Sequence, residues 1–247
     1  MEITFNDKKI LIAGAGSDFA QPLIPEFIND TNKVGLAVFT SADRLTNYMN
    51  KKNVKIFSSD LSIPENGISL VENFVEWAGG IDIFIQLTGK VSNPCSFESL
   101  NVTDWNHDLD VNLTTPFFMA QTALKYMPPY SKIILTGSAS AGQHGGGLKT
   151  FAYGVGKCGI GRVVRGIAKY SGDKKVLINC IAPGFINTRM HIKAGKSPSD
   201  IVKRTETVPL KCAGEVSDVT SLILYLVSDQ NRYINGQTIV IDGGDFL

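Results

Sequence analysis

The stretch "ILIAGAGSDFAQPLIP" at residues 10–25 combines an apolar run, a glycine-containing turn and the start of a helical pattern. A strand that leads through such a turn into a helix can hold a dinucleotide pyrophosphate with backbone N–H groups. Gly14 and Gly16 supply the tight turn, but Asp18 and Ala20 stand where a three-glycine loop has its other glycines. By itself the stretch therefore leaves two interpretations open, a nucleotide site and an ordinary strand–helix turn.

Short apolar runs separated by helical patterns recur along the whole chain. Several of the runs are apolar almost continuously, which is typical of strands covered on both faces. The runs occupy residues 8–14, 34–40, 54–60, 81–89, 131–138, 175–184 and 236–244, and clear helical patterns occupy 66–78, 115–127 and 159–172. This alternation predicts an α/β fold with a single doubly wound, Rossmann-type domain over residues 1–247, with helices on both faces of a parallel sheet. Ligand-binding residues are then expected just after each run.

Composition and charge narrow the classes of function. A formal net charge of +1 gives no reason to expect a nucleic-acid partner, and no apolar run reaches the length of a membrane span. The N-terminus lacks the pattern of a signal peptide. The four cysteines show no CxxC spacing, so we expect free thiols, a cytoplasmic location and no metal site.

Four polar residues carry the chemistry that the pattern suggests. In "FAYGVGKCGI", Tyr153 and Lys157 lie four residues apart and project from one face of a helix. Ser138 ends the strand "IILTGS", and Asn112 lies in "DVNL" one unit earlier. With "INCIAPGFINTRM" and the closing "IDGG", this set resembles the short-chain dehydrogenase/reductase family over residues 8–244, and the C-terminal segment is similar to its 3-oxoacyl-carrier-protein reductase branch.

The resemblance implies an NAD(P)-dependent oxidoreductase, such as a ketoreductase, that acts on a small carbonyl or alcohol substrate. It also implies about seven parallel strands and assigns the catalytic roles. Tyr153 is the general acid or base, Ser138 binds the substrate oxygen, Lys157 binds the nicotinamide ribose, and Asn112 holds a water that links Lys157 to solvent. Because a neighbouring ammonium favours a phenolate, we expect Lys157 to lower the pKa of Tyr153. The usual spacing to the tyrosine favours Ser140 instead of Ser138, so both serines stay candidates.

The same resemblance places the coenzyme. Counting from Gly35, Ala42 replaces the acid that binds an NAD ribose, and Arg44 is available for a 2′-phosphate, which slightly favours NADP(H) over NAD(H). The predicted cofactor-binding residues are Gly14, Gly16, Ser17, Asp18, Phe19, Ala42, Arg44, Asp60, Leu61, Leu87, Gly89, Tyr153, Lys157, Pro183, Gly184, Ile186 and Thr188.

Three further expectations arise from the resemblance. Residues 188–210 form a substrate lid, and the chain forms a homo-oligomer, a tetramer or a dimer. The altered glycine loop also supports an alternative, a protein of this fold that binds nucleotides but is catalytically impaired. The intact Asn112, Ser138, Tyr153 and Lys157 favour the enzyme.

Overall fold

A seven-stranded sheet forms the middle of the molecule. The computed structural model describes residues 3–142, 147–189 and 197–246. The strand order is β3-β2-β1-β4-β5-β6-β7, and every neighbouring pair is parallel. The strands are β1 (Lys9–Ala13), β2 (Lys33–Val38), β3 (Val54–Ser58), β4 (Ile83–Gln86), β5 (Lys132–Thr136), β6 (Leu177–Pro183) and β7 (Thr238–Ile241). Each strand falls within one of the seven apolar runs, give or take a terminal residue, so the predicted fold class is confirmed.

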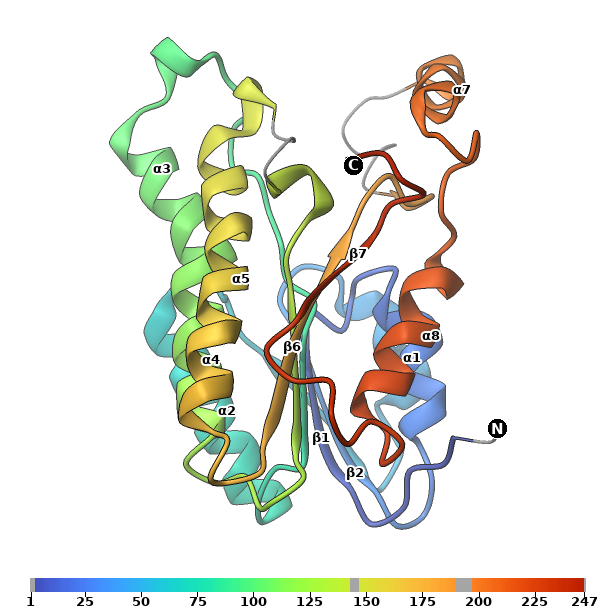
Figure 1. Ribbon diagram of the computed structural model, residues 1–247. Coiled ribbons are helices and arrows are strands. Elements are labelled where there is room, and N and C mark those ends of the chain that lie inside the picture. Colours follow the sequence, from blue (N-terminus) through green and yellow to red (C-terminus); the bar gives the residue numbers. More distant parts are fainter. Residues whose placement is uncertain (1–2, 143–146, 190–196, 247) are drawn as a thin grey trace.

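The helices cover both faces of this sheet. In Figure 1, α2, α4 and α5 lie on one face and α1 and α8 on the other, while α7 lies beyond the carboxyl ends of the strands. The helices are α1 (Ala20–Phe27), α2 (Pro64–Ala78), α3 (Val102–Leu109), α4 (Thr115–Ala123), α5 (Phe151–Tyr170), α7 (Pro198–Thr207) and α8 (Val216–Val227). Part of the predicted lid, residues 190–196, lies outside the described residues. Among the described residues, no helix is both long enough and apolar enough to cross a membrane.

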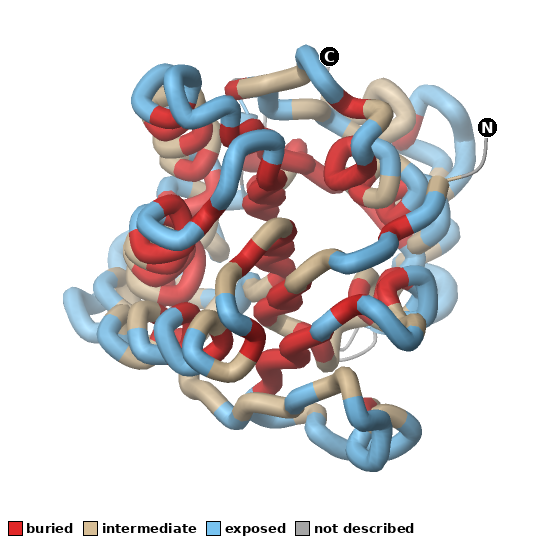
Figure 2. The backbone as a smooth tube through the Cα atoms, turned by 90° about the horizontal axis from the view of Figure 1, so that it is seen from below, coloured by how far each residue is buried: buried red, intermediate tan, exposed pale blue. Residues whose placement is uncertain are grey.

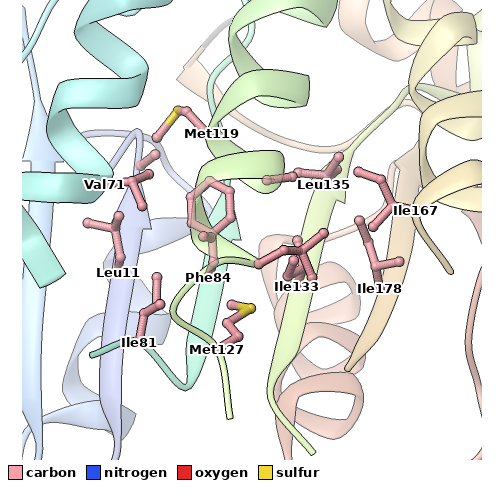
Figure 3. Close-up of a cluster of buried hydrophobic side chains, with 14 of the residues drawn as sticks. Leu11, Val71, Ile81, Phe84, Met119, Met127, Ile133, Leu135, Ile167 and Ile178 are labelled. Atoms are coloured by element: carbon pink, nitrogen blue, oxygen red, sulfur yellow. The ribbon is translucent and has the colours of Figure 1, made fainter. Parts of the chain in front are cut away.

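Burial explains why the central strands are apolar without alternation. All residues of β5 and β6 are buried, because helices cover both of their sides. Seen along the sheet in Figure 2, buried residues run through the centre and exposed residues form the periphery. Figure 3 shows one of the two cores, in which Leu11, Phe84 and Ile133 of the sheet pack against Val71 and Met119 of α2 and α4. The buried central strands therefore form a rigid support for the loops that follow their carboxyl ends.

Candidate active site

A cleft of about 680 Å³ opens at the carboxyl ends of the strands, beside the point where the strand order reverses between β1 and β4. This is where open parallel sheets bind ligands. Most of the predicted site residues line it: Gly14, Gly16, Ser17, Asp18, Phe19, Asp60, Leu61, Leu87, Gly89, Ser138, Tyr153, Lys157, Pro183, Gly184, Ile186 and Thr188.

The glycine turn forms a tight backbone cradle, in which side chains at Gly14 and Gly16 would clash with neighbouring segments. Gly14 has a φ of +84°, and a Cβ on it would lie 2.9 Å from the backbone nitrogen of Thr88. A Cβ on Gly16 would lie 2.8 Å from the Cβ of Ser41. The Ser17 hydroxyl accepts a hydrogen bond from the Ala20 nitrogen at 3.2 Å, at the start of α1. This cradle fits the pyrophosphate of a dinucleotide, which needs close backbone approach at a helix N-terminus.

The residues after β2 differ from the predicted set. Phe39, Thr40 and Ser41 line the cleft, whereas Ala42 and Arg44 do not. The reason is local: β2 ends at Val38, and a 3₁₀ helix over Ala42–Tyr48 carries the later residues away from the cleft. Arg44 instead donates from Nη1 to the Gly16 carbonyl at 2.7 Å and to Asp18 Oδ1 at 2.9 Å.

Ser138, Tyr153 and Lys157 meet in the cleft from two elements. Ser138 follows β5, and Tyr153 and Lys157 lie on the first turns of α5. Tyr153 shares a hydrogen bond with Ser138. Ser138 Oγ lies 2.9 Å from Ser140 Oγ, and of the two serines only Ser138 is among the residues that line the cleft. Lys157 Nζ lies 5.9 Å from the centre of the Tyr153 ring.

The pKa of Tyr153 shifts in the opposite direction to the one that we expected. Burial raises the pKa of Tyr153 above its usual value, and the hydrogen bond with Ser138 offsets only part of that effect. The net shift is therefore upward, opposite to the lowering that we expected from the spacing between Tyr153 and Lys157. Desolvation disfavours the phenolate more strongly than the neighbouring groups favour it.

Lys157 is a buried ammonium with backbone partners. Its Nζ donates to the carbonyl oxygens of Thr88 at 3.0 Å and Thr136 at 2.9 Å. Burial lowers the pKa of Lys157 to about 8. Burial also raises the pKa of the adjacent Cys180 thiol to about 11, so this thiol stays largely neutral while Lys157 titrates.

The pKa of Lys157 predicts a pH-dependent stability. Because the folded pKa of about 8 lies below the usual 10.5, the unfolded chain binds more protons between these pH values. As pH rises through that window, the titration of Lys157 therefore increases the free energy of unfolding, by about 3 kcal/mol in all. Urea unfolding of the wild type and of Lys157→Met, compared at each pH, measures this contribution. The wild type should gain on the variant as pH rises, and a difference that stays constant with pH contradicts the assignment.

Asn112 lies behind the cleft in an irregular helical turn. Asp110–Thr114 forms a π-helical turn between α3 and α4, a distortion often found at functional sites. Asn112 is fully buried, and its Nδ2 donates to the carbonyl oxygens of Lys90 at 2.7 Å and Asp108 at 2.8 Å. Its Oδ1 accepts from the Lys90 nitrogen at 3.2 Å. Asn112 thus fixes the segment after β4, which borders Lys157 through Gly89.

Three basic cleft residues were not among those predicted: Lys90, His107 and Arg189. Lys90 and His107 lie near Asp60, whose pKa is lowered mainly by hydrogen bonds from the Ser62 nitrogen and hydroxyl and further by these two side chains. Asp60 is therefore ionised at neutral pH. Lys90 could have been predicted, because it directly follows "QLTG" at the end of a strand, where ligand-binding residues are expected. Nothing in the sequence indicates that Arg189 lies at this site.

Comparison with known proteins gives the family. The profile described as "Enoyl-(Acyl carrier protein) reductase" matches residues 28–245. A 3-oxoacyl-[acyl-carrier-protein] reductase of Buchnera aphidicola is 29% identical over 246 residues, which is 97% of this chain and 98% of that protein. An L-rhamnose-1-dehydrogenase of Scheffersomyces stipitis is 30% identical over 80% of this chain and 76% of its own length. A short chain dehydrogenase from Burkholderia cenocepacia, solved in complex with NADP, superposes with a TM-score of 0.85 at 22% identity, covering 98% of this chain and 99% of that one.

The fold and the site thus define a Rossmann-type oxidoreductase. The chain belongs to the short-chain dehydrogenase/reductase family. It is an NAD(P)-dependent oxidoreductase that acts on CH–OH groups.

Proposed function

We propose that this enzyme transfers a hydride between a nicotinamide coenzyme and a small carbonyl or secondary alcohol, with Tyr153 as the general acid or base. The observation that carries the proposal is the meeting of Ser138, Tyr153 and Lys157 in one cleft with the Gly14–Gly16 backbone cradle. When bound, the reduced coenzyme supplies the hydride that reaches the carbonyl carbon. The chain's own residues supply the proton and the orientation.

Tyr153 is suited to be the acid in reduction. Because burial raises its pKa, the phenol is protonated at neutral pH and holds a proton for the carbonyl oxygen. The Ser138 hydroxyl holds that oxygen beside the phenol. In the oxidative direction Tyr153 takes the proton back from the alcohol. Lys157 anchors the coenzyme ribose and stabilises the phenolate that reduction leaves behind.

The coenzyme preference is proposed to lean toward NADP(H). The support is the chemistry of the cleft after β2, where Phe39, Thr40 and Ser41 offer no carboxylate to bind an NAD ribose. Arg44 lies close by, but it is held by Asp18. The preference is therefore expected to be weak.

Other parts of the proposal extend beyond the cleft. Segment 188–210, which contains α7, is proposed as the substrate lid of a single catalytic domain that spans residues 1–247. The enzyme is proposed to be a cytoplasmic homo-oligomer, a tetramer or a dimer. Four cysteines that form no disulfide support the reducing compartment. Sedimentation that shows only a 26.8 kDa monomer at micromolar concentration would count against the oligomer.

Fluorescence titration with NADH and NADPH, followed by a panel of aldehydes and ketones, tests the proposal. We expect both coenzymes to bind, NADPH somewhat more tightly, and at least one carbonyl to be reduced. The competing candidate, an impaired nucleotide-binding protein, is favoured by the altered glycine loop. It predicts binding without turnover on any member of the panel, whereas failure to bind either coenzyme at millimolar concentration rejects both candidates.

Ser138→Ala and Ser140→Ala separate the two candidate serines. We expect Ser138→Ala to lower kcat by about 10²-fold, the typical effect of losing a donor to the reacting oxygen. Ser140→Ala should cost less than about tenfold, because its hydroxyl acts on the oxygen only through its contact with Ser138. Steady-state kinetics with one carbonyl substrate measures both, and a larger loss in Ser140→Ala reverses the assignment.

A further inference from the structure

Asp18 joins three segments that are far apart in the sequence. From the segment after β2, Arg44 donates to its Oδ1 at 2.9 Å. From the segment after β6, Arg189 donates from Nε to Oδ1 at 2.9 Å and from its backbone nitrogen to Oδ2 at 2.8 Å. Asp18 itself belongs to the glycine turn. We call this set of Asp18, Arg44 and Arg189 the charge bridge.

The charge bridge carries a net positive charge. Burial tends to raise the pKa of Asp18, but the hydrogen bonds and charge of Arg189, together with the charge of Arg44, lower it overall. Asp18 is thus an anion between two guanidinium cations, and the side chain of Asp18 is only 17% exposed. The two arginines cancel a charge that would otherwise repel any anion bound at this turn.

The two arginines occupy different positions. Arg44 does not line the cleft, is mostly buried, and is fixed to the turn through the Gly16 carbonyl at 2.7 Å. Arg189 lines the cleft, and its side chain is 49% exposed. Its contact with Asp18 uses Nε and the backbone nitrogen. Arg44 is therefore an anchor, whereas Arg189 faces the space that a ligand enters.

We infer that Arg189 is a cationic ligand of the dinucleotide pyrophosphate, and that Asp18 is the positioning residue that holds it over the glycine turn. The inference rests on the proposed function. A pyrophosphate bound at the α1 N-terminus would occupy the cleft that the turn and residues Ile186, Thr188 and Arg189 line together. A guanidinium suits it, since its fork of N–H donors matches phosphate oxygens. Asp18 stands where the loop usually has a glycine. Instead of allowing a closer approach of the backbone, it holds the cationic side chain of Arg189 beside the pyrophosphate.

Arg189→Gln tests the phosphate contact in the full-length protein. We expect its dissociation constants for NADH and NADPH to rise by about tenfold each, the usual effect of losing one charge-assisted hydrogen bond. The ratio of the two constants should stay unchanged, because the pyrophosphate is common to both coenzymes. Arg189→Lys keeps the charge and should recover part of the loss. The matched control is Arg232→Gln, which removes an exposed arginine that does not line the cleft and should bind as the wild type.

A double-mutant cycle with Asp18→Asn tests the positioning role. If Asp18 holds Arg189 in place, Arg189→Gln should cost distinctly less affinity in the Asp18→Asn background than in the wild type. Equal costs in the two backgrounds contradict the positioning role. Thermal unfolding of the coenzyme-free proteins serves as the second readout.

The outcomes separate the two proposals. If Arg189→Gln lowers the unfolding temperature but binds both coenzymes as tightly as the wild type, Arg189 is only a structural tether and this inference is wrong, while the proposed function stands. If the wild type itself binds neither coenzyme, the proposed function is wrong, and the inference about Arg189 is wrong with it.

Discussion

Tyr153→Phe is expected to lower kcat by about 10²-fold or more while leaving coenzyme affinity nearly unchanged. The substitution keeps the ring and removes the only proton that the residue can donate, and general acid–base catalysis typically contributes an effect of this size. Tyr153 is the group best placed for that role, because it lies in the cleft, shares a hydrogen bond with Ser138 and is protonated at neutral pH. Steady-state kinetics and coenzyme titration of the same preparation measure both quantities.

Tyr170→Phe is the matched control for this prediction. Tyr170 ends the same helix, α5, and is 69% exposed, so its hydroxyl should be dispensable. Near-normal turnover in Tyr153→Phe would remove Tyr153 from the proton transfer. A collapse of coenzyme affinity with little change in kcat would instead make it a binding residue.

Gly14→Ala is expected to weaken coenzyme binding by more than tenfold and to destabilise the fold. Gly14 has a φ of +84°, which costs an L-residue about 1–2 kcal/mol. The added Cβ would also lie 2.9 Å from the Thr88 nitrogen, so the turn or the segment after β4 must shift. Both segments line the cleft, and a shift of either one would displace backbone N–H groups from the proposed pyrophosphate site.

Gly79→Ala separates backbone strain from steric clash. Gly79 ends α2 with a φ of +80°, but apart from the adjoining backbone no atom lies within 4 Å of the position that its Cβ would take. It should therefore lose about 1–2 kcal/mol in urea unfolding and bind coenzyme normally. If Gly14→Ala loses no more stability than Gly79→Ala and also binds normally, the turn is not the tight cradle that we describe.

Strand positions were predictable from the sequence because burial on both faces leaves continuous apolar runs. "KIILT" and "LINCIAP" became β5 and β6, with every residue buried. The cleft was also largely predictable, since ligands of such sheets lie just beyond the strand ends. The residues after β2 were not, because counting along the chain cannot show where a strand stops. β2 ends at Val38, so Phe39 rather than Ala42 borders the cleft.

Two properties of the site depend on tertiary structure alone. Asp18 and Arg189 are 171 residues apart, and no local pattern announces their contact. The pKa of Tyr153 depends on burial, and the spacing of four residues to Lys157 gave the wrong direction. Residue types and spacings identify which side chains take part, whereas their charge states depend on the groups that surround them in the folded chain.

The π-helical turn at Asp110–Thr114 also fixes the rotational phase between two helices. Each residue added to or removed from a helix rotates its N-terminal part by about 100° relative to its C-terminal part. α4 packs on α2, whereas α3 is tied elsewhere, through the Asp108 carboxylate that accepts from the Ser92 nitrogen at 2.8 Å and through Trp105 beside Phe151. A one-residue deletion in the turn would swing α3 away from these partners and draw Asp108 away from Ser92. The number of residues in this turn is therefore constrained along with the identity of the buried Asn112.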